Sequence, residues 1–402
     1  MRVYFLLLLV AGAVTYLSTP AARWLARRTH AISAVRDRDV HTIATARLGG
    51  LAILAGIVVG VLVASRMPFL ADVIDKPEVW GIVGGAVMVA LLGWADDVWD
   101  LDWMTKLAGQ VLATGFMAIM QVQLTTWPIP GQFVIPGSRL SLFVTIVVVV
   151  ATMNAVNFVD GLDGLAAGTI AIGGSAFFLY TYGLTQQTSP QDYASIASLM
   201  IAVLVGACLG FLPHNFHPSH IFMGDSGSMV LGLVLAGATI SVTGQINPDQ
   251  TYAAQAVPAF VPLLLPVAIV ILPLLDMILA VVRRLAKGRS PFAPDRMHLH
   301  HRMLALGHSH RRAVVILYVW TAVFAFGSAA LLIWEVPAVL AGTGVAALAA
   351  LGLTLGPLRT HGRILDDDVA TGAVPLPREA ASAPETDAPT SRPASPPTRP
   401  GR

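Results

Sequence analysis

The sequence predicts an all-α, polytopic integral membrane protein with about eleven transmembrane helices. Hydrophobic residues make up 55% of the 402 residues and charged residues only 12%, whereas a typical soluble domain has about 25% charged residues. The mean hydropathy is +0.70. Apolar runs long enough to cross ~30 Å of hydrocarbon recur along the chain. We therefore expect membrane lipid to solvate most of the surface, and we expect no nucleic-acid partner.

The apolar runs define the predicted spans. They cover residues 3–26, 48–66, 79–95, 104–123, 140–156, 162–183, 194–212, 225–243, 257–282, 313–333 and 336–357. The run 257–282 contains four prolines, which would bend a helix. From Asp366 on, the chain is rich in Pro, Ala, Ser and Thr, a composition that cannot bury a core. The sequence thus divides into a transmembrane domain, 1–358, and a disordered cytoplasmic tail, 359–402.

Lys and Arg residues are distributed unequally between the two ends of these spans. If the first span runs from outside to inside, 21 of the 25 Lys and Arg residues face the cytoplasm and 4 face outward. Omitting the six Arg residues of the tail leaves 15 against 4. The positive-inside rule therefore predicts an N-terminus outside and a C-terminus in the cytoplasm. The predicted inner loops are residues 27–47, 95–104, 157–162, 213–224 and 283–312.

The first acidic cluster, DDVWDLD at residues 96–102, closes the third predicted span on the inner side. Asp96 and Asp100 would lie one helical turn apart, with Asp97 beside them. Packed carboxylates repel one another at a membrane surface unless a cation is present. A solvated helix end is the simpler interpretation, but four Asp residues within seven positions favour a metal or phosphate site.

The second cluster, NAVNFVDGLDG at residues 154–164, follows the fifth predicted span. Asn157, Asp160 and Asp163 are spaced three residues apart, so on helical geometry they would form one stripe. The glycines of the motif permit a tight turn and the close approach of a ligand. One Asp would suffice as a helix cap, and the motif has more polar residues than capping needs.

The third cluster, FMGDSGS at residues 222–228, opens the eighth predicted span from the inside. Asp225 would offer a hard oxygen ligand beside the free backbone N–H groups of a helix start. That combination suits Mg²⁺ and phosphate. As a helix cap alone, Asp225 would be unremarkable.

A long basic loop, Arg283–Arg312, holds five of the eleven His and eight of the 25 Lys and Arg residues. Three closely spaced histidines are compatible with zinc. Because the loop has no Cys and no conventional zinc spacing, its arginines favour an anionic ligand instead. The preceding inner loop adds three histidines, which either extend this electropositive surface or are solvated loop residues: His214, His217 and His220.

All four clusters fall on the inner face that Lys and Arg predict. Acidic side chains for a divalent cation, basic side chains for anions and glycine-rich helix starts for phosphate would meet at one interface. Together they indicate Mg²⁺-assisted phosphoryl transfer between a soluble and a lipid-borne partner.

The motifs DDVWD, NAVNFVDGLDG, FMGDSGS and HLHHR, in this order, resemble those of a known superfamily. It is the polyprenyl-phosphate N-acetylhexosamine-1-phosphate transferase superfamily, of the glycosyltransferase 4 type, which includes WecA, TagO and MraY. The motif PDRMHLHHRM is similar to the WecA/TagO branch, which uses UDP-GlcNAc. The MraY branch, which uses UDP-MurNAc-pentapeptide, typically has three consecutive histidines at this place.

The resemblance implies roles for the residues of the acidic motifs. Asp225 and Asn157 would hold Mg²⁺, or Mn²⁺ in its place, on the pyrophosphate. Asp96 and Asp97 would be catalytic carboxylates, with Asp97 the favoured base. Asp160, also expected to be catalytic, would shape the nucleotide and sugar-phosphate site.

The resemblance also implies roles in the loops. Asp163 would act beside Asp160, and Asn215 and Phe222 would lie near the uracil. The family's first inner loop often has Pro where this chain has Ala46, and it would contribute two substrate-binding residues, His41 and Arg47. The basic loop would close over the sugar and the diphosphate, with Arg302 neutralising leaving-group charge; its residues are His298, His300, His301 and Arg302.

The implied reaction is attack by the oxygen of undecaprenyl or decaprenyl phosphate on the β-phosphorus of UDP-GlcNAc. The products are polyprenyl-diphosphate-GlcNAc and UMP, in the first membrane step of a cell-envelope polysaccharide. We expect a bacterial plasma (inner) membrane, with the active site on the cytoplasmic face. The polymer, the lipid length and a homodimeric state stay open.

Three alternatives compete with this interpretation. The nearest is an MraY-like transferase using UDP-MurNAc-pentapeptide. An intramembrane prenyltransferase would show two similar Asp-rich motifs, whereas DDVWD occurs once. A secondary transporter would carry acidic residues at mid-span, and Asp276 is the one candidate. The GlcNAc-1-phosphate transferase accounts for more of the motifs than any of these.

Overall fold

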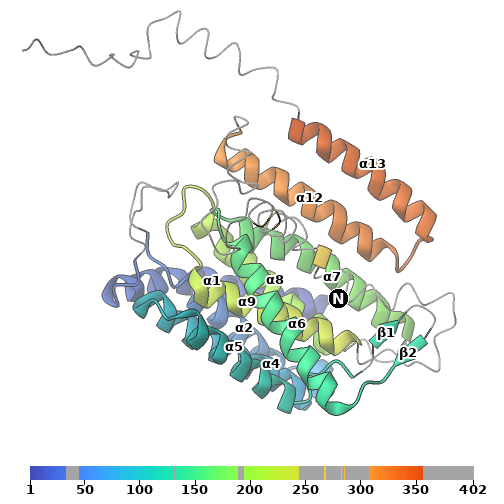
Figure 1. Ribbon diagram of the computed structural model, residues 1–402, viewed down its shortest axis with the longest axis horizontal. Helices are drawn as coiled ribbons and strands as arrows, with labels where there is room; N and C mark the ends of the chain where they lie inside the picture. Colours follow the sequence, from blue (N-terminus) through green and yellow to red (C-terminus); the bar gives the residue numbers. More distant parts are fainter. Residues whose placement is uncertain are drawn as a thin grey trace, which may run out of the picture. The chain divides into compact units, whose positions relative to one another are not determined.

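The computed structural model describes residues 1–32, 45–125, 127–129, 132–188, 194–243, 267–268, 282, 285 and 308–355. In this part of the chain the fold is a helical bundle (Figure 1). Its long helices are α1 (Arg2–Arg28), α2 (Gly49–Ala64), α4 (Pro77–Trp99), α5 (Trp103–Ile119), α6 (Ser138–Val159), α7 (Leu165–Thr188), α8 (Ile196–Asn215), α9 (Gly224–Thr243), α12 (His310–Ala330) and α13 (Val336–Leu355). The short elements are η1 (Pro68–Leu70), α3 (Ala71–Ile74), β1 (Trp127–Ile129) and β2 (Gln132–Val134).

The all-α, polytopic prediction is confirmed. Among the described residues, eight helices are long and apolar enough to cross a membrane, or nine if α2 and the bent η1–α3 segment after it form one span. Every predicted span except 257–282 has a helix at its position. The run 257–282 lies almost wholly outside the described residues, and so does the tail 359–402. The small β1–β2 hairpin, in a predicted outer loop, is a local addition to the helical fold.

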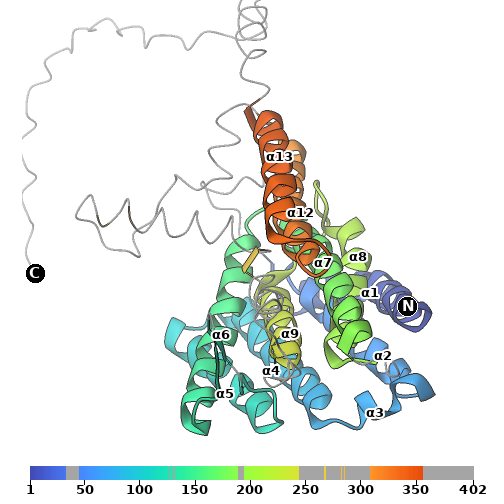
Figure 2. The same cartoon turned by 90° about the vertical axis from the view of Figure 1, so that its right-hand side faces the viewer.

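Helix α9 is the most enclosed of the spans that the structure describes. Of its most apolar 18-residue window, 94% is buried, against 11% for α13. It packs against α2, α4, α6 and α8, as its yellow ribbon in the middle of Figure 2 shows. The α9 sequence is apolar on all sides and rich in Gly, Ala, Ser and Thr, which is what a helix needs to be surrounded closely by other helices in a membrane.

Two glycines let the start of α9 approach its neighbours closely. A Cβ atom on Gly93 of α4 would lie 2.3 Å from the backbone nitrogen of Ser226, and one on Gly50 of α2 would lie 2.1 Å from that of Gly227. Any side chain at either position would force the backbones apart. The packing therefore fixes the first turn of α9 against the C-terminal half of α4.

The segment before α2 is tied to the segment before α9. The backbone nitrogen of Phe222 donates to the carbonyl of Ala46 at 2.8 Å, and that of Gly49 donates to the carbonyl of Phe222 at 3.0 Å. Arg47 and Phe222 form an isolated parallel bridge. This pairing brings Arg47 next to the loop that leads into Asp225.

Candidate active site

A polar cluster lies where the C-terminal ends of α4 and α6 meet the start of α9. From α6, Asn157 donates through Nδ2 to Oδ1 of Asp225 and to Oγ of Ser228, both at 2.9 Å. Turning the amide over would present its oxygen to the same point, which gives an oxygen pair suited to a hard cation. The two predicted metal ligands are thus adjacent in space.

The carboxylate of Asp97 accepts hydrogen bonds from backbone N–H groups at the N-terminus of α9. Its Oδ1 accepts from the backbone N–H of Asp225 at 3.3 Å, and its Oδ2 accepts from that of Ser226 at 3.5 Å. A helix N-terminus favours negative charge. Gly224, with φ +73°, makes this contact possible, because a Cβ atom there would lie 2.5 Å from Oδ2 of Asp97. The carboxylate of Asp97 therefore lies at a helix N-terminus, a position that would also favour a phosphate oxygen.

Lys106 of α5 joins the carboxylates of α4 and α9. Its ammonium lies 3.1 Å from Oδ2 of Asp96 and also forms an ion pair with Oδ2 of Asp225. A single cation thus bridges two carboxylates that are 129 positions apart in the sequence. The sequence prediction missed Lys106, because it counted that residue only as inner-face charge.

The other two acidic residues of the first cluster do not join this site. Helix α4 ends at Trp99, and Asp100 follows in a left-handed conformation with φ 52°. Asp100 does lie one helical turn after Asp96, as predicted, because its backbone N–H donates to the carbonyl of Asp96 at 2.9 Å, but the left-handed conformation ends the helix at this residue. Asp102 instead caps α5, with Oδ1 accepting from the backbone N–H groups of Met104 at 2.9 Å and Thr105 at 3.1 Å. Hydrogen bonds from Thr105, first from its hydroxyl, hold the pKa of Asp102 below its usual range.

The predicted helical stripe of Asn157, Asp160 and Asp163 is also wrong. Helix α6 ends at Val159, and the chain turns through residues 160–164 before α7 begins. Asp160 is the residue that closes α6. The buried side chain of Asp163 faces another loop, where its Oδ2 lies 2.8 Å from Nδ1 of His217. The glycine-containing turn separates the two aspartates because it breaks the helical repeat.

The carboxyl of Asp160 is affected by several charged side chains of the site. Burial raises its pKa well above the usual range, and the charges of Asp97 and Asp163 raise it further, whereas Arg47 lowers it. The described residues here include four carboxylates, on Asp96, Asp97, Asp160 and Asp225, but only two permanent side-chain cations, on Lys106 and Arg47. An added divalent cation would relieve this excess of negative charge.

The predicted uracil-side residues have distinct surroundings. Asn215 is buried, and its amide joins two loops, since Oδ1 accepts from the N–H of Gly164 at 3.1 Å and Nδ2 donates to the carbonyl of Ile221 at 3.0 Å. Phe222 is half-buried beside the Arg47 bridge. Their roles towards uracil stay predictions. Five further predicted residues lie outside the described part of the chain: His41, His298, His300, His301 and Arg302.

Comparison with known proteins finds that the chain is similar to a group of phosphotransferases. Residues 79–243 match the model of glycosyl transferase family 4. The chain is 42% identical over 363 residues to the decaprenyl-phosphate N-acetylglucosaminephosphotransferase of Mycobacterium tuberculosis, covering 88% of this chain and 89% of the relative. It is 30% identical over 313 residues to a Bacillus subtilis protein described as a probable undecaprenyl-phosphate N-acetylglucosaminyl 1-phosphate transferase, covering 77% and 80%. It is also 30% identical over 374 residues to the phospho-N-acetylmuramoyl-pentapeptide-transferase of Desulforudis audaxviator, covering 86% and 99%.

Replacing Lys106 by Gln should change how the purified protein responds to Mg²⁺. Without its ammonium, Asp96 and Asp225 repel each other, so the melting temperature in EDTA should fall. Mg²⁺ no longer competes with the lysine, so its apparent Kd should tighten by about tenfold, or roughly 1.4 kcal/mol. Thermal unfolding across a Mg²⁺ titration measures both effects.

Lys76→Gln is the matched control, since Lys76 precedes α4 at the end opposite to Asp96. It should leave the Mg²⁺ titration as in the wild type. Identical titrations for Lys106→Gln and the wild type would show that the bridged carboxylates are not the cation site.

Proposed function

The chain belongs to glycosyl transferase family 4, and from this premise we propose that it transfers GlcNAc-1-phosphate from UDP-GlcNAc to a polyprenyl phosphate. The products are polyprenyl-diphosphate-GlcNAc and UMP. The preference for UDP-GlcNAc over UDP-MurNAc-pentapeptide is supported by 42% identity to a decaprenyl-phosphate N-acetylglucosaminephosphotransferase, against 30% to a phospho-N-acetylmuramoyl-pentapeptide-transferase. The motif His298-Leu299-His300-His301 favours the same donor.

One observation carries the proposal. Asp96 and Asp97 of α4, Asn157 of α6 and Asp225 of α9 come together at one point although they are distant in the sequence. A bundle built only for stability would gain little from assembling carboxylates at a helix N-terminus, because each buried charge carries a desolvation cost. A reaction between two anionic substrates needs such a cluster to bind a cation.

We propose Mg²⁺ as the cofactor, with Mn²⁺ able to replace it. The donor set fits, because Asp225, Asp96 and the amide oxygen of Asn157 are the hard oxygen ligands that Mg²⁺ prefers. The ammonium of Lys106 already bridges Asp96 and Asp225, so a positive charge is accommodated there. When bound, the ion neutralises charge on the diphosphate and orients it for displacement.

The chain's own residues would then prepare the two phosphates. Lys106, displaced from Asp225, would be free to pair with a phosphate oxygen, and Arg47 would approach from the segment beside Phe222. Asp97 would accept the proton of any monoprotonated lipid phosphate, although a phosphate monoester with a second pKa of about 6 is mostly dianionic at neutral pH. The lipid oxygen forms a bond to the β-phosphorus as the bond from that phosphorus to the bridging oxygen breaks, and UMP leaves.

We also propose the location of this chemistry. The site residues lie at the ends of α4 and α6 and the start of α9, and the distribution of Lys and Arg supports a position of these ends at the cytoplasmic face of a bacterial plasma membrane. UDP-sugars are soluble and would reach the site from that side. The membrane would deliver the lipid-borne acceptor.

UMP release tests the reaction. With Mg²⁺, decaprenyl or undecaprenyl phosphate and UDP-GlcNAc, the purified wild-type protein should release UMP. Asp225→Asn should lose the negative charge of a cation ligand, and Asp97→Asn should lose charge at the α9 start. Each should lower the rate by about 10²–10⁴-fold.

Asp102→Asn is the matched control, because Asn replaces Asp well as a helix cap and Asp102 is exposed outside the cluster. It should keep wild-type turnover. Full activity in a folded Asp225→Asn variant would refute the cation assignment, and release from UDP-MurNAc-pentapeptide in preference to UDP-GlcNAc would refute the donor.

Cysteine labelling tests the orientation. In a Cys208→Ser background, which removes the single native cysteine, Ser138→Cys at the first position of α6 should react with a membrane-impermeant maleimide in intact cells. His220→Cys, before α9, should react only after the membrane is opened. Both positions are exposed, so the reverse pattern would contradict a cytoplasmic site.

A further inference from the structure

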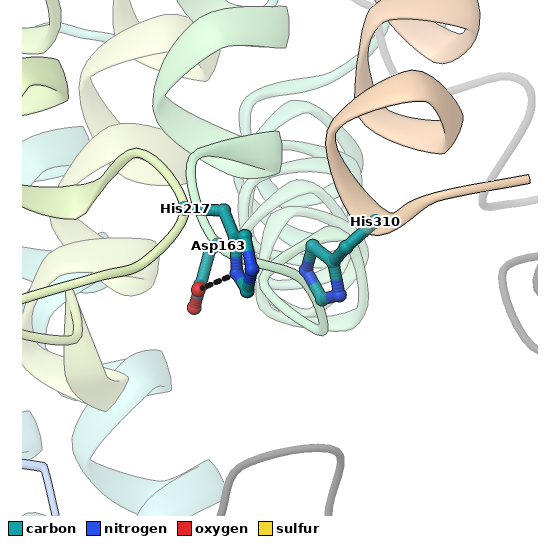
Figure 3. Close-up of side chains that lie close together, drawn as sticks. All are labelled: Asp163, His217 and His310. Carbon is teal, nitrogen blue, oxygen red and sulfur yellow. Dashed lines mark hydrogen bonds and ion pairs between the residues drawn. The ribbon is translucent and has the colours of Figure 1, made fainter. Parts of the chain in front are cut away.

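We propose that Asp163, His217 and His310 form a binding site for a transition metal ion of the zinc type, separate from the oxygen-lined Mg²⁺ site. One ligand atom from each of the three side chains lies within 4.8 Å of the other two. Figure 3 shows the carboxylate of Asp163 directed at the imidazole of His217, with the His310 ring on the far side. The three residues come from the α6–α7 turn, the α8–α9 loop and the first position of α12.

The carboxylate and the first imidazole are already aligned with each other. Oδ2 of Asp163 lies 2.8 Å from Nδ1 of His217 and accepts from the backbone N–H of Ser219 at 3.2 Å. Such an additional hydrogen bond holds a ligating carboxylate in one orientation. An ion could replace the proton between these two atoms with a small increase in their separation.

The second imidazole is close but must turn. The rings of His217 and His310 stack with centroids 4.4 Å apart and planes 19° apart. In nearly parallel rings the nitrogen lone pairs do not point at one common atom. Rotation of the His310 ring about its χ2 torsion, which is broad for a terminal ring, brings a nitrogen towards the other two ligands.

The three segments are held together by contacts that do not involve the ligand side chains. Nε of Arg311 donates to the carbonyl of His217 at 3.0 Å, and the hydroxyl of Tyr318 donates to the carbonyl of Gly164 at 2.5 Å. Asn215 binds the N–H of the same glycine. The ligand-bearing backbones are thus positioned before any ion binds, which lowers the ordering cost of binding.

The donor set selects the class of metal. Two imidazole nitrogens and one carboxylate oxygen suit Zn²⁺ and its neighbours, whereas Mg²⁺ prefers oxygen alone. The Asp163 side chain is 1% exposed and that of His217 is 35% exposed, so the cluster is enclosed on one side and open on the other. Three protein ligands leave a fourth position for water or for an incoming group.

A metal at this place would connect α12 to the two loops beside the transferase site. His310 follows Arg302 by eight residues in the sequence. The ion would therefore fix the point at which the basic loop rejoins the helical bundle. This role does not depend on the proposed transferase reaction, because binding can be measured without substrates.

Cobalt binding tests the site. The untagged full-length protein is stripped with EDTA, reconstituted in nanodiscs and titrated with Co²⁺, and the visible absorption of the bound ion is recorded. We expect one tightly bound Co²⁺ per chain, displaced by Zn²⁺ but not by a large excess of Mg²⁺. His217→Ala and His310→Ala should each weaken the affinity by at least about tenfold, in line with the loss of a metal-orienting group.

Three variants complete the test. His220→Ala removes an exposed histidine of the same loop and should bind as the wild type does, and so should a His298→Ala/His300→Ala/His301→Ala variant. If His217→Ala unfolds, His217→Asn takes its place in the test, since asparagine keeps a hydrogen-bonding group but supplies no imidazole. The proposal would be overturned by unchanged Co²⁺ affinity in folded His217 and His310 variants, or by the absence of tight binding in the wild type. The cluster would then be a hydrogen-bonded Asp163–His217 pair whose imidazole stacks on the His310 ring.

Discussion

The contact between the carboxylate of Asp97 and the N-terminus of α9 is the interaction on which the rest of the site depends. It requires two helix backbones to meet almost without side chains between them, and Gly93 and Gly224 provide that space. Once α9 starts at this point, Asp225 projects towards Asn157 and Lys106. The close packing of α9 against its neighbours therefore also determines where the polar cluster forms.

The excess of negative charge follows from this arrangement. Helix α9 brings the Asp225 carboxylate to the end of α4, where two more carboxylates lie, and the α6–α7 turn adds Asp160. Burial, and after it the charges of Asp97 and Asp163, raise the pKa of Asp160, so this carboxyl holds its proton more tightly than an exposed one. A site with more carboxylates than side-chain cations is suited to bind a divalent cation together with anionic substrates. It is much less suited to bind a neutral substrate.

The sequence was sufficient for the fold class and for the meeting of the three acidic motifs, but not for how they meet. Hydrophobic length predicted the spans because each helix must satisfy its own backbone in lipid, and the Asn157–Asp225 pair was expected from the family resemblance. The stripe through Asp163 failed because the chain leaves the helix at Asp160. Lys106 and His217 could not be found by spacing, since their partners are brought close only by the tertiary packing.

Manganese binding followed by electron paramagnetic resonance tests the central claim most directly. Titration of the substrate-free protein should show one Mn²⁺ bound per chain, competed by Mg²⁺. The bound signal should be lost in Asp225→Asn and weakened in Asn157→Leu. A bound Mn²⁺ with the same affinity in both folded variants would contradict the account, because the cation would then be held by residues other than those that α6 and α9 bring together.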